Sequence, residues 1–439
     1  MASMMELINE IWHLERELVS DGFDKALYRL AEEISMQIHE YRSGTQIWTW
    51  KVPEKWTCHE AYLETLSGER LIDYADHPLH IVSYSLPFEG EVSRTELFKH
   101  LHTHKNESDL IPFVFKYYQR DWGLCCTQEL KNTLQDDKYR VVIKTSFEEG
   151  ELKVGEVVVE GELEDIFVLA AHLCHPHMAN DDLTGVVAGL ELMKRLAEGP
   201  KPKYTYRFLI LPETVGSVAY LSSHESLIPQ MRGGLFLEML GNDSKLTLQR
   251  SLDANKQIDN TLVAAFKEQV TDGYVGDYRT IICNDERQFN SPGVKVPMLS
   301  ISRVENPEKI ESLYQPYPEY HSSADTPEIV TEERLNQAVN VIYEMIRAVE
   351  RDLYVVNHFK GEVFASGYGI WIDYRENPEG HRNLFKIMER CDGEHTISGI
   401  AEELGITYKA VWDILNSFAE KELISYSPSP RSTDPHKSV

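Results

Sequence analysis

The chain has 439 residues, of which 42% are hydrophobic and 10% aromatic, so it can form a large buried core and exceeds the usual size of one domain. Seventy-one acidic residues outnumber 44 basic ones and give a formal net charge of −27. This charge argues against binding to nucleic-acid phosphates or to anionic membrane surfaces. Small molecules and other proteins are the expected partners.

The cysteine content and the N-terminal sequence predict a cytoplasmic protein. Six cysteines are few for this length, and no two of them form a C-x-x-C pair. The N-terminal residues contain no apolar run long enough for a signal peptide, and no later stretch approaches the ~20 apolar residues of a membrane-spanning helix. We therefore expect reduced thiols and no membrane association.

The N-terminal third of the chain changes from helical to strand-like patterns. Residues 5–41 carry apolar side chains at helical spacing and predict two amphipathic helices. From residue 51 to about 160 the apolar stretches become short and strand-like, and turns of Gly, Asp and Pro separate them. This pattern predicts an inserted β-rich domain over 51–160.

The segment 161–358 repeats an order of buried strand, polar loop and helix. Its first strand covers 166–171 and precedes a His-rich loop, the next strand ends at Glu213, and a third carries Glu238 near its end. Polar residues at the carboxyl ends of buried strands place a site along one edge of a sheet. The prediction is an α/β fold with a mostly parallel sheet, formed by residues 1–50 together with 161–358.

The C-terminal segment predicts a small separate domain. Residues 380–428 contain three short amphipathic helices and a final β-like stretch, which is typical of a winged helix. Its third helix has Lys409 as its one strong cation and also carries Asp413. DNA binding needs several cations on that face, so we expect a packing or oligomerisation role. The tail 429–439 is rich in Ser and Pro and is predicted to be disordered.

Histidine and carboxylate residues occur in an order that predicts a metal centre. His172 directly follows the first buried strand, and Asp181 lies nine residues later, at the start of a helix. His321 lies further along, in the string YHSSADT. Zinc binds through such N and O ligands, and hydrolytic sites keep one position open for water. The pattern predicts a zinc hydrolase, with His175 as an alternative to His172 for the first ligand.

The chain resembles the co-catalytic zinc aminopeptidase superfamily over residues 161–350. The string DDLTG resembles the family's Asp-Asn-x-Ser-Gly element, PETVGSVAY its Glu-Glu and Gly-Ser-x-x-Tyr elements, and HSSADT its His-x-x-x-Asp-Thr element. The resemblance implies the following roles: His172 first ligand, Asp181 bridging carboxylate, Glu213 one of the paired glutamates, Glu238 acidic ligand, Asp285 in the Ser-Asp-His element, and His321 last ligand.

Three positions depart from that pattern. Cys174 replaces the Asp of the His-x-Asp element, which normally orients the first histidine. Pro212 replaces one of the paired glutamates, and Glu286 replaces the histidine after Asp285. The reduced ligand set favours a single zinc over a pair.

Nearly the whole chain also resembles a bacterial aminopeptidase-like family of formerly unknown function with a C-terminal winged helix. The strings KVPEKWT, YYQRDWGLC, CHPHMANDD and NDERQF carry this resemblance. It implies zinc dependence and an association with surface-polysaccharide pathways.

Together these features predict a zinc-dependent aminopeptidase that acts on a small peptide or aminoacyl amide and can form homo-oligomers. Glu213 is the expected general base, while Asp285 and Arg287 are candidates for substrate binding. One alternative is a catalytically weakened sensor on the peptidase fold, which Cys174 and Pro212 favour. Another is an amide hydrolase or deacetylase in surface-polysaccharide metabolism.

Overall fold

The computed structural model describes residues 2–254, 257–310 and 315–427 and divides into two compact units. The first unit contains the described residues up to 252 together with 274–339, and the second contains those of 253–273 and from 340 onward. The predicted disordered tail, 429–439, lies outside the described residues.

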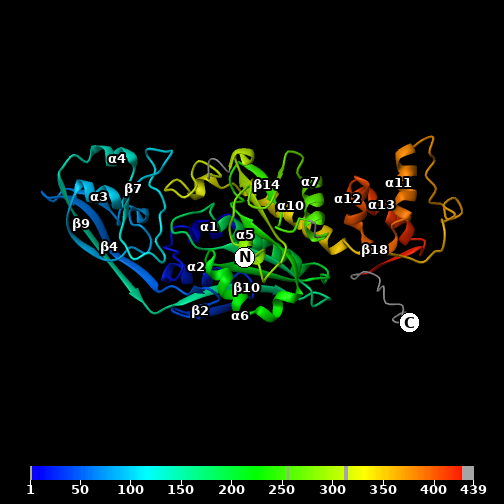
Figure 1. Cartoon of the computed structure of the whole chain (residues 1–439), viewed down its shortest axis with the longest axis horizontal. Coiled ribbons are helices and arrows are strands. Elements are labelled where there is room, and N and C mark those ends of the chain that lie inside the picture. The colour runs from blue at the N-terminus through cyan, green and yellow to red at the C-terminus, as the bar shows by residue number, and fades with distance from the viewer. Residues whose placement is uncertain (1, 255–256, 311–314, 428–439) are drawn as a thin grey trace. The chain divides into compact units, whose positions relative to one another are not determined.

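A mixed eight-stranded sheet forms the centre of the first unit (Figure 1). Its strands, in spatial order, are β1 (Gln37–Arg42), β10 (Glu151–Val159), β12 (Thr205–Leu211), β11 (Ile166–His172), β13 (Met231–Glu238), β16 (Met298–Val304), β14 (Lys245–Gln249) and β15 (Tyr274–Gly276). The central strands β12, β11, β13 and β16 run parallel, whereas β1, β10 and β14 pair antiparallel with their inner neighbours. The sheet is therefore mixed, where the sequence predicted a mostly parallel one.

The order of the central strands creates a crevice at their carboxyl ends. The chain passes from β11 through α5 (Leu183–Glu198) to β12, then through α6 (Val215–Ser223) and η2 (Glu225–Gln230) back past β11 to β13. Because such crossovers are right-handed, connections in opposite directions leave on opposite faces of the sheet. The ends of β11, β12 and β13 therefore meet at a switch point, where α/β folds bind ligands.

Gly185 explains how α5 reaches this crevice. A Cβ atom at this position would lie 2.3 Å from the carbonyl oxygen of Leu237 in β13. Glycine therefore allows the first turn of α5 to pack directly on the β13 backbone. The glycine of the DDLTG string is a packing requirement, and it brings Asp181 and Asp182 to the end of the sheet.

Further helices and short elements complete the first unit. α1 packs against α5, and α2 packs on β10. These and the remaining elements are α1 (Met4–Ile11), α2 (Asp21–Ala31), β2 (Gln46–Ile47), β3 (Trp50–Lys51), α8 (Glu286–Phe289), η3 (Pro307–Lys309) and η4 (Pro327–Ile329).

Strands between β3 and β10 form a second sheet of four strands in the order β5, β4, β9, β6 (Figure 1). Their bounds and those of the elements near them are β4 (Lys55–Thr65), β5 (Arg70–Asp73), η1 (Pro78–His80), β6 (Phe88–Ser93), α3 (Arg94–His100), β7 (Leu101–His102), β8 (Leu124–Cys125), α4 (Gln128–Thr133) and β9 (Lys138–Glu148). β10, which the sequence placed in this region, pairs instead with β12 of the large sheet over Gly155–Val159. The predicted boundary at 160 therefore lies too far along the chain, because a strand pattern does not reveal which sheet a strand joins.

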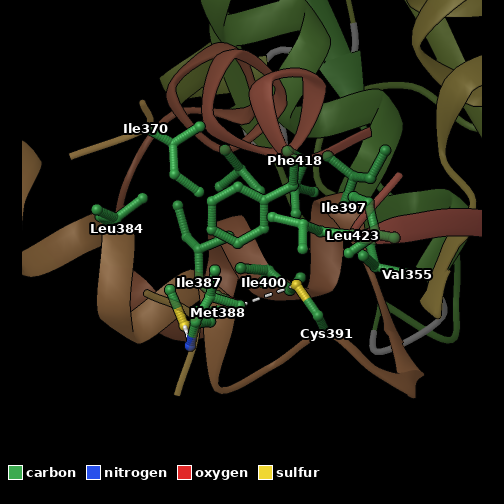
Figure 2. Packing of buried hydrophobic residues seen from close by; sticks show 14 of the residues in the cluster. Val355, Ile370, Leu384, Ile387, Met388, Cys391, Ile397, Ile400, Phe418 and Leu423 are labelled. Carbon is green, nitrogen blue, oxygen red and sulfur yellow. Dashed lines mark hydrogen bonds between the residues drawn. The ribbon is translucent and has the colours of Figure 1, made fainter. Parts of the chain in front are cut away.

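Among the described residues, the second unit has a three-stranded sheet and four helices besides the end of α10. β17 lies between β18 and β19. The bounds are α7 (Gln257–Gln269), β17 (Tyr354–Asn357), α11 (Pro378–Met388), β18 (Asp392–Thr396), α12 (Ile397–Leu404), α13 (Tyr408–Ala419) and β19 (Ile424–Ser427), with the end of α10 (Glu332–Arg351) leading into them. Figure 2 shows its apolar core, in which the Phe418 ring lies among the side chains of Ile387, Ile397 and Leu423.

This unit is larger than the predicted domain 380–428. Asp352, which follows α10, accepts hydrogen bonds from the backbone N–H of Ser398 at 2.8 Å, from its hydroxyl at 2.6 Å, and from Gln257 Nε2 at 2.9 Å. One buried carboxylate thus ties α7 and α12 to the end of α10. Across the described residues, no helix has the length and apolar character needed to cross a membrane.

Candidate metal centre

Asp181 lies at the centre of a cluster of buried imidazoles and carboxylates. Its Oδ1 is 3.1 Å from His172 Nε2, and its Oδ2 is 3.0 Å from His321 Nε2 and 3.3 Å from His175 Nδ1. Glu238 Oε1 lies 3.9 Å from His172 Nε2. The two oxygens of one carboxylate therefore face two different sets of side chains.

These side chains form groups with the spacing of metal ligands. One group is His172, Asp181 and Glu238, and the other is His175, Asp181 and His321, with donor atoms within 4.8 Å of one another in each. Both histidines that competed for the first ligand position are thus present, in different groups. Each group could hold a cation, and the two share one carboxylate, so the single zinc expected from the sequence stays a prediction.

Cys174 completes a third group with His172 and His175. Burial raises the pKa of the Cys174 thiol to about 12, so a cation bound there would have to displace its proton. Its Sγ accepts a hydrogen bond from the backbone N–H of Glu213 at 3.2 Å and lies 3.8 Å from His172 Nδ1. Cys174 therefore contacts His172 Nδ1, the ring nitrogen that the aspartate of the His-x-Asp element would contact in the superfamily that the chain resembles.

The polar atoms that face one another in this cluster support a metal cofactor. Within the described part of the chain, these buried atoms make no hydrogen bond of good geometry: His172 Nε2, His175 Nδ1 and Nε2, both carboxylate oxygens of Asp181, Glu238 Oε2 and His321 Nε2. Buried polar atoms without such a partner are costly, and a bound cation would satisfy them together. Imidazole and carboxylate donors are typical zinc ligands.

The charges around Asp181 shift the pKa values of the neighbouring side chains. Burial opposes a charge on His175, but the Asp181 and Glu213 carboxylates outweigh burial and hold its pKa well above the usual range. Burial and the neighbouring Asp181 carboxylate raise the pKa of Glu238 well above its usual range. Metal ligands must lose such protons, so metal binding here releases protons and weakens as the pH falls.

Glu213 is the candidate general base and lies beside both groups at the end of β12. Its Oε2 is 3.3 Å from His175 Nε2, its Oε1 is 3.9 Å from Arg287 Nη2, and its side chain is 23% exposed. Burial opposes its negative charge, but the imidazole of His175 lowers its pKa to about 2. Glu213 is therefore ionised at neutral pH and able to accept a proton.

Asp285 and Arg287, the predicted substrate contacts, differ in position. Asp285 is fully buried, and its Oδ1 accepts hydrogen bonds from the backbone N–H of Thr214, at 2.8 Å, and from the Ser217 hydroxyl. It lies behind Glu213 and supports the segment that carries it, in place of the substrate contact expected from the sequence. Arg287 is 32% exposed beside Glu213 and stays a candidate.

Three residues that sequence reasoning missed or read differently hold the ligands in place. Asn284 Nδ2 donates a hydrogen bond to Glu238 Oε1. Asp325, the aspartate of the HSSADT string, accepts hydrogen bonds from the backbone N–H of Asn180 at 2.6 Å and of Asp181 at 3.2 Å. The Tyr317 hydroxyl donates to the same Asp325 carboxylate at 2.7 Å. The family's His-x-x-x-Asp-Thr pattern marked Asp325, but no local signal marked Asn284.

Arg16 is a further missed residue, and it holds the loop between His172 and Asp181. Its guanidinium is fully buried and donates to the carbonyl oxygens of Leu173 at 2.8 Å, His175 at 2.7 Å and Met178 at 2.7 Å. Two further hydrogen bonds reach the end of α1, at the carbonyls of Ile11 and Trp12. Burial lowers its pKa to about 10, so it remains charged at neutral pH. A single side chain thus joins α1 to the ligand loop.

The backbone around the centre is strained at several non-glycine residues. His175, Thr214, Met239 and His321 have φ angles of +80°, +62°, +52° and +52°. Such angles are uncommon for residues with a Cβ and persist where the surrounding contacts impose them. Their concentration beside the ligands is typical of a functional site.

Comparison with solved structures defines the class of fold. The chain is similar to a zinc aminopeptidase from Bacillus subtilis, with a TM-score of 0.59, 15% identity, and coverage of 79% of this chain and 94% of that one. At this identity the likeness shows the fold alone. The mixed α/β unit therefore has a zinc aminopeptidase-like fold.

The family follows from the sequence comparison. The chain belongs to the family described as "Domain of unknown function (DUF4910)", whose profile matches residues 5–352. A Clostridium acetobutylicum protein with the provisional name "polysaccharide biosynthesis protein with aminopeptidase-like domain" is 32% identical over 425 residues, which is 95% of each chain. A crystal structure from the same organism, provisionally called a peptidase, has a TM-score of 0.82, 30% identity and 96% coverage of both chains.

Proposed function

We propose that this protein is a zinc-dependent hydrolase, an aminopeptidase that cleaves a small peptide or aminoacyl amide. The observation that carries the proposal is the Asp181 carboxylate shared between two ligand groups, with Glu213 ionised and partly exposed beside them. His172, Asp181 and Glu238 would hold one zinc ion, and His175, Asp181 and His321 a second. Zinc bound there supplies a Lewis acid that polarises the scissile carbonyl and makes water more acidic.

In this proposal Glu213 carries the proton. Its carboxylate accepts a proton from the attacking water and returns it to the nitrogen of the leaving amine. His175 keeps the carboxylate in position, because its Nδ1 faces Asp181 while its Nε2 faces Glu213 Oε2. The pKa of about 2 for Glu213 applies with a protonated His175 beside it. If His175 held a zinc ion instead of its extra proton, its remaining ring N–H could still orient the Glu213 carboxylate, which lies 3.3 Å from His175 Nε2.

Hydrolysis of an amide on a saccharide is the second candidate, and the printed name of the Clostridium acetobutylicum relative favours it. The same ligands and the same base would serve this reaction, since only the group around the amide changes. The contact of Cys174 with His172 weakens the sensor alternative, because the first ligand keeps a neighbour at its second ring nitrogen.

For the C-terminal residues 380–428 we propose a winged-helix module that serves packing or oligomerisation. Lys409, the cation of its third helix, donates to Asp413 at 2.9 Å and 3.1 Å, and its backbone N–H donates to Glu268 of α7. An ion-paired lysine offers little to a phosphate backbone, which supports a role other than DNA binding.

Metal analysis with an aminoacyl-amide panel tests the proposed function. We expect zinc to copurify and at least one aminoacyl amide to be cleaved. Glu213→Gln should keep its zinc and lose about 10²–10⁴-fold in kcat, as expected for removal of a general base. Glu91→Gln, on the exposed edge of β6, is the matched control and should match the wild type. A fully active Glu213→Gln, or a zinc-free protein without turnover, contradicts the proposal.

A further inference from the structure

Three aromatic side chains at alternate positions of one segment contact one another in sequence, starting beside the metal centre. Phe113, Phe115 and Tyr117 alternate in sequence, with ring centroids 5.7 Å apart for the first pair and 4.4 Å for the second. The second pair is stacked, with an interplanar angle of 17°. Phe115 is 43% exposed, so part of this aromatic ladder faces solvent.

The ladder begins on the proposed ligands themselves. The Phe113 ring lies 5.1 Å from that of His175 and 5.4 Å from that of His321, edge to face in both cases. Its backbone N–H donates to the carbonyl of His321 at 2.8 Å. The segment from the four-stranded-sheet region therefore lines one side of the metal centre. The backbone hydrogen bond between Phe113 and His321 fixes its position there.

The other end of the ladder reaches a cavity. Tyr117 contacts the Tyr84 ring at 5.3 Å, and both help to line a cavity of about 390 Å³ together with Tyr118 and Phe147. Tyr118 is 48% exposed, and its hydroxyl donates to the carbonyl of Lys51 at 2.7 Å. Tyr117 thus belongs to both the ladder and the cavity lining, and the ring contacts run from it through Phe115 to Phe113 beside the proposed ligands.

The charged groups of the cavity balance one another. Arg120 forms an ion pair with Glu54 and lies over the Phe147 ring, 4.7 Å from its centroid. Lys51 and Glu149 also line the cavity, so two cations and two carboxylates surround it. A strongly charged ligand would meet as much repulsion as attraction there. A neutral ligand with many hydroxyl groups can hydrogen-bond to both kinds of charge.

We propose that the ladder and this cavity bind the saccharide part of an amide-bearing glycoconjugate, with the amide directed to the metal centre. A sugar ring has apolar C–H faces that pack on aromatic rings, and polar edges that reach Lys51 or Glu54. A purely apolar side chain would displace water from these charged groups and offer them no hydrogen bond in return, which is costly. The inference rests on the proposed function for the fate of the amide, but the binding of the sugar does not require turnover.

Binding of a disaccharide of N-acetylglucosamine to the zinc-loaded full chain tests this proposal. Titration calorimetry or ligand-observed NMR should show saturable binding to the wild type. Tyr118→Ala and Phe115→Ala should each weaken binding by about tenfold, because each removes one stacking face. Tyr118→Phe keeps the ring and should bind within about twofold of the wild type.

Tyr28→Ala is the matched control, because Tyr28 of α2 is 49% exposed and lies outside the ladder and the cavity. It should bind like the wild type, as should Glu213→Gln. Absence of saturable binding by the folded wild type overturns the proposal, and so does an equal loss in Tyr28→Ala. Displacement of the disaccharide by phenylalanine amide, with the same losses in Tyr118→Ala and Phe115→Ala, also overturns it. Sugar binding without any hydrolysis would reject the hydrolase and leave this binding site standing.

Discussion

The candidate metal centre and the core of the C-terminal unit are both largely buried, but opposite kinds of interaction hold them. Around Asp181, charged and polar groups from distant parts of the chain meet, and four non-glycine residues nearby have positive φ angles. Around Phe418, apolar side chains pack between regular helices and a small sheet (Figure 2). Strain and polar atoms without hydrogen bonds of good geometry are typical of a functional site, whereas the burial of apolar side chains contributes stability.

The largest expected effect is a loss of bound zinc, and comparing variants of the shared and unshared ligands distinguishes the two ligand groups. Asp181→Asn removes the charge that both groups share, so it should abolish tight zinc binding at both positions. Glu238→Gln and His321→Ala should each remove zinc from one position only. Metal content after dialysis measures this directly. Asp181→Asn with a wild-type zinc content would show that the two groups do not share this carboxylate, and equal total loss in all three variants would indicate a single position.

Arg16 tests whether distant contacts hold the ligand loop. Arg16→Met leaves three loop carbonyls without their buried donor, so we expect zinc affinity to fall about 10–100-fold, as for loss of other groups that orient ligands. Arg16→Lys keeps the charge but has fewer hydrogen-bond donors, so its zinc affinity should lie between those of the wild type and Arg16→Met. Competition with a chelator gives the affinity. Arg94→Met is the control, since Arg94 lies in α3 and donates to the carbonyl of Gln135. An unchanged affinity with lowered stability would make Arg16 purely structural.

A substitution in the C-terminal core should lower the stability of that unit without changing zinc binding at the candidate metal centre. Phe418→Ala empties the middle of the C-terminal core and should lower the free energy of unfolding of that unit by about 3–5 kcal/mol. Zinc content and zinc affinity should stay at wild-type values, because none of the proposed ligands lies in that unit. Chemical denaturation followed together with zinc release measures both. Loss of zinc in the same transition would show that the two units unfold together.

The difference between the regions also explains what the sequence could predict. Helices of the C-terminal unit follow local signals, such as the Thr396 cap of α12 and Gly405, which ends it at a φ of +64°. Strand ends predicted His172, Glu213 and Glu238, because carboxyl ends of neighbouring strands meet in space. The zinc aminopeptidase-like fold is confirmed, whereas the roles of the individual ligands stay predictions.

The contacts that the sequence could not predict are those made over long distances. Arg16 is 157 residues from its partner Leu173, and nothing in its own helical pattern marks it as a support of the loop. The pairing of β10 with β12 is equally non-local, since the alternation of a strand fixes its faces but not its neighbour. Phe113 belongs to the predicted inserted domain, and its ring contacts that of His321. The sequence did not indicate that this domain would supply a residue beside the candidate metal centre.

Lowering the pH should destabilise the first unit by protonating buried carboxylates. Glu156 of β10 is the residue at which this effect can be tested. Its carboxylate accepts hydrogen bonds from His39 at 2.9 Å, Tyr220 at 2.5 Å and Arg207 at 2.6 Å. Burial opposes its charge, but these donors outweigh burial and lower its pKa from 4.5 to about 2. Because the folded pKa is depressed, the stabilisation is present above pH 4.5 and is lost as the pH falls toward 2.

Glu156→Gln removes this dependence. At pH 6 the wild type should be more stable than the variant by up to about 3 kcal/mol, since each pKa unit corresponds to about 1.4 kcal/mol. The difference should shrink between pH 4.5 and 2, whereas the Phe418→Ala difference, which involves no titrating group, should stay nearly constant over the same range. Urea unfolding at several pH values tests both. If the difference in free energy of unfolding between the wild type and Glu156→Gln did not change with pH, the hydrogen bonds of Glu156 would not depend on its charge. The two regions would then not differ in their response to acid.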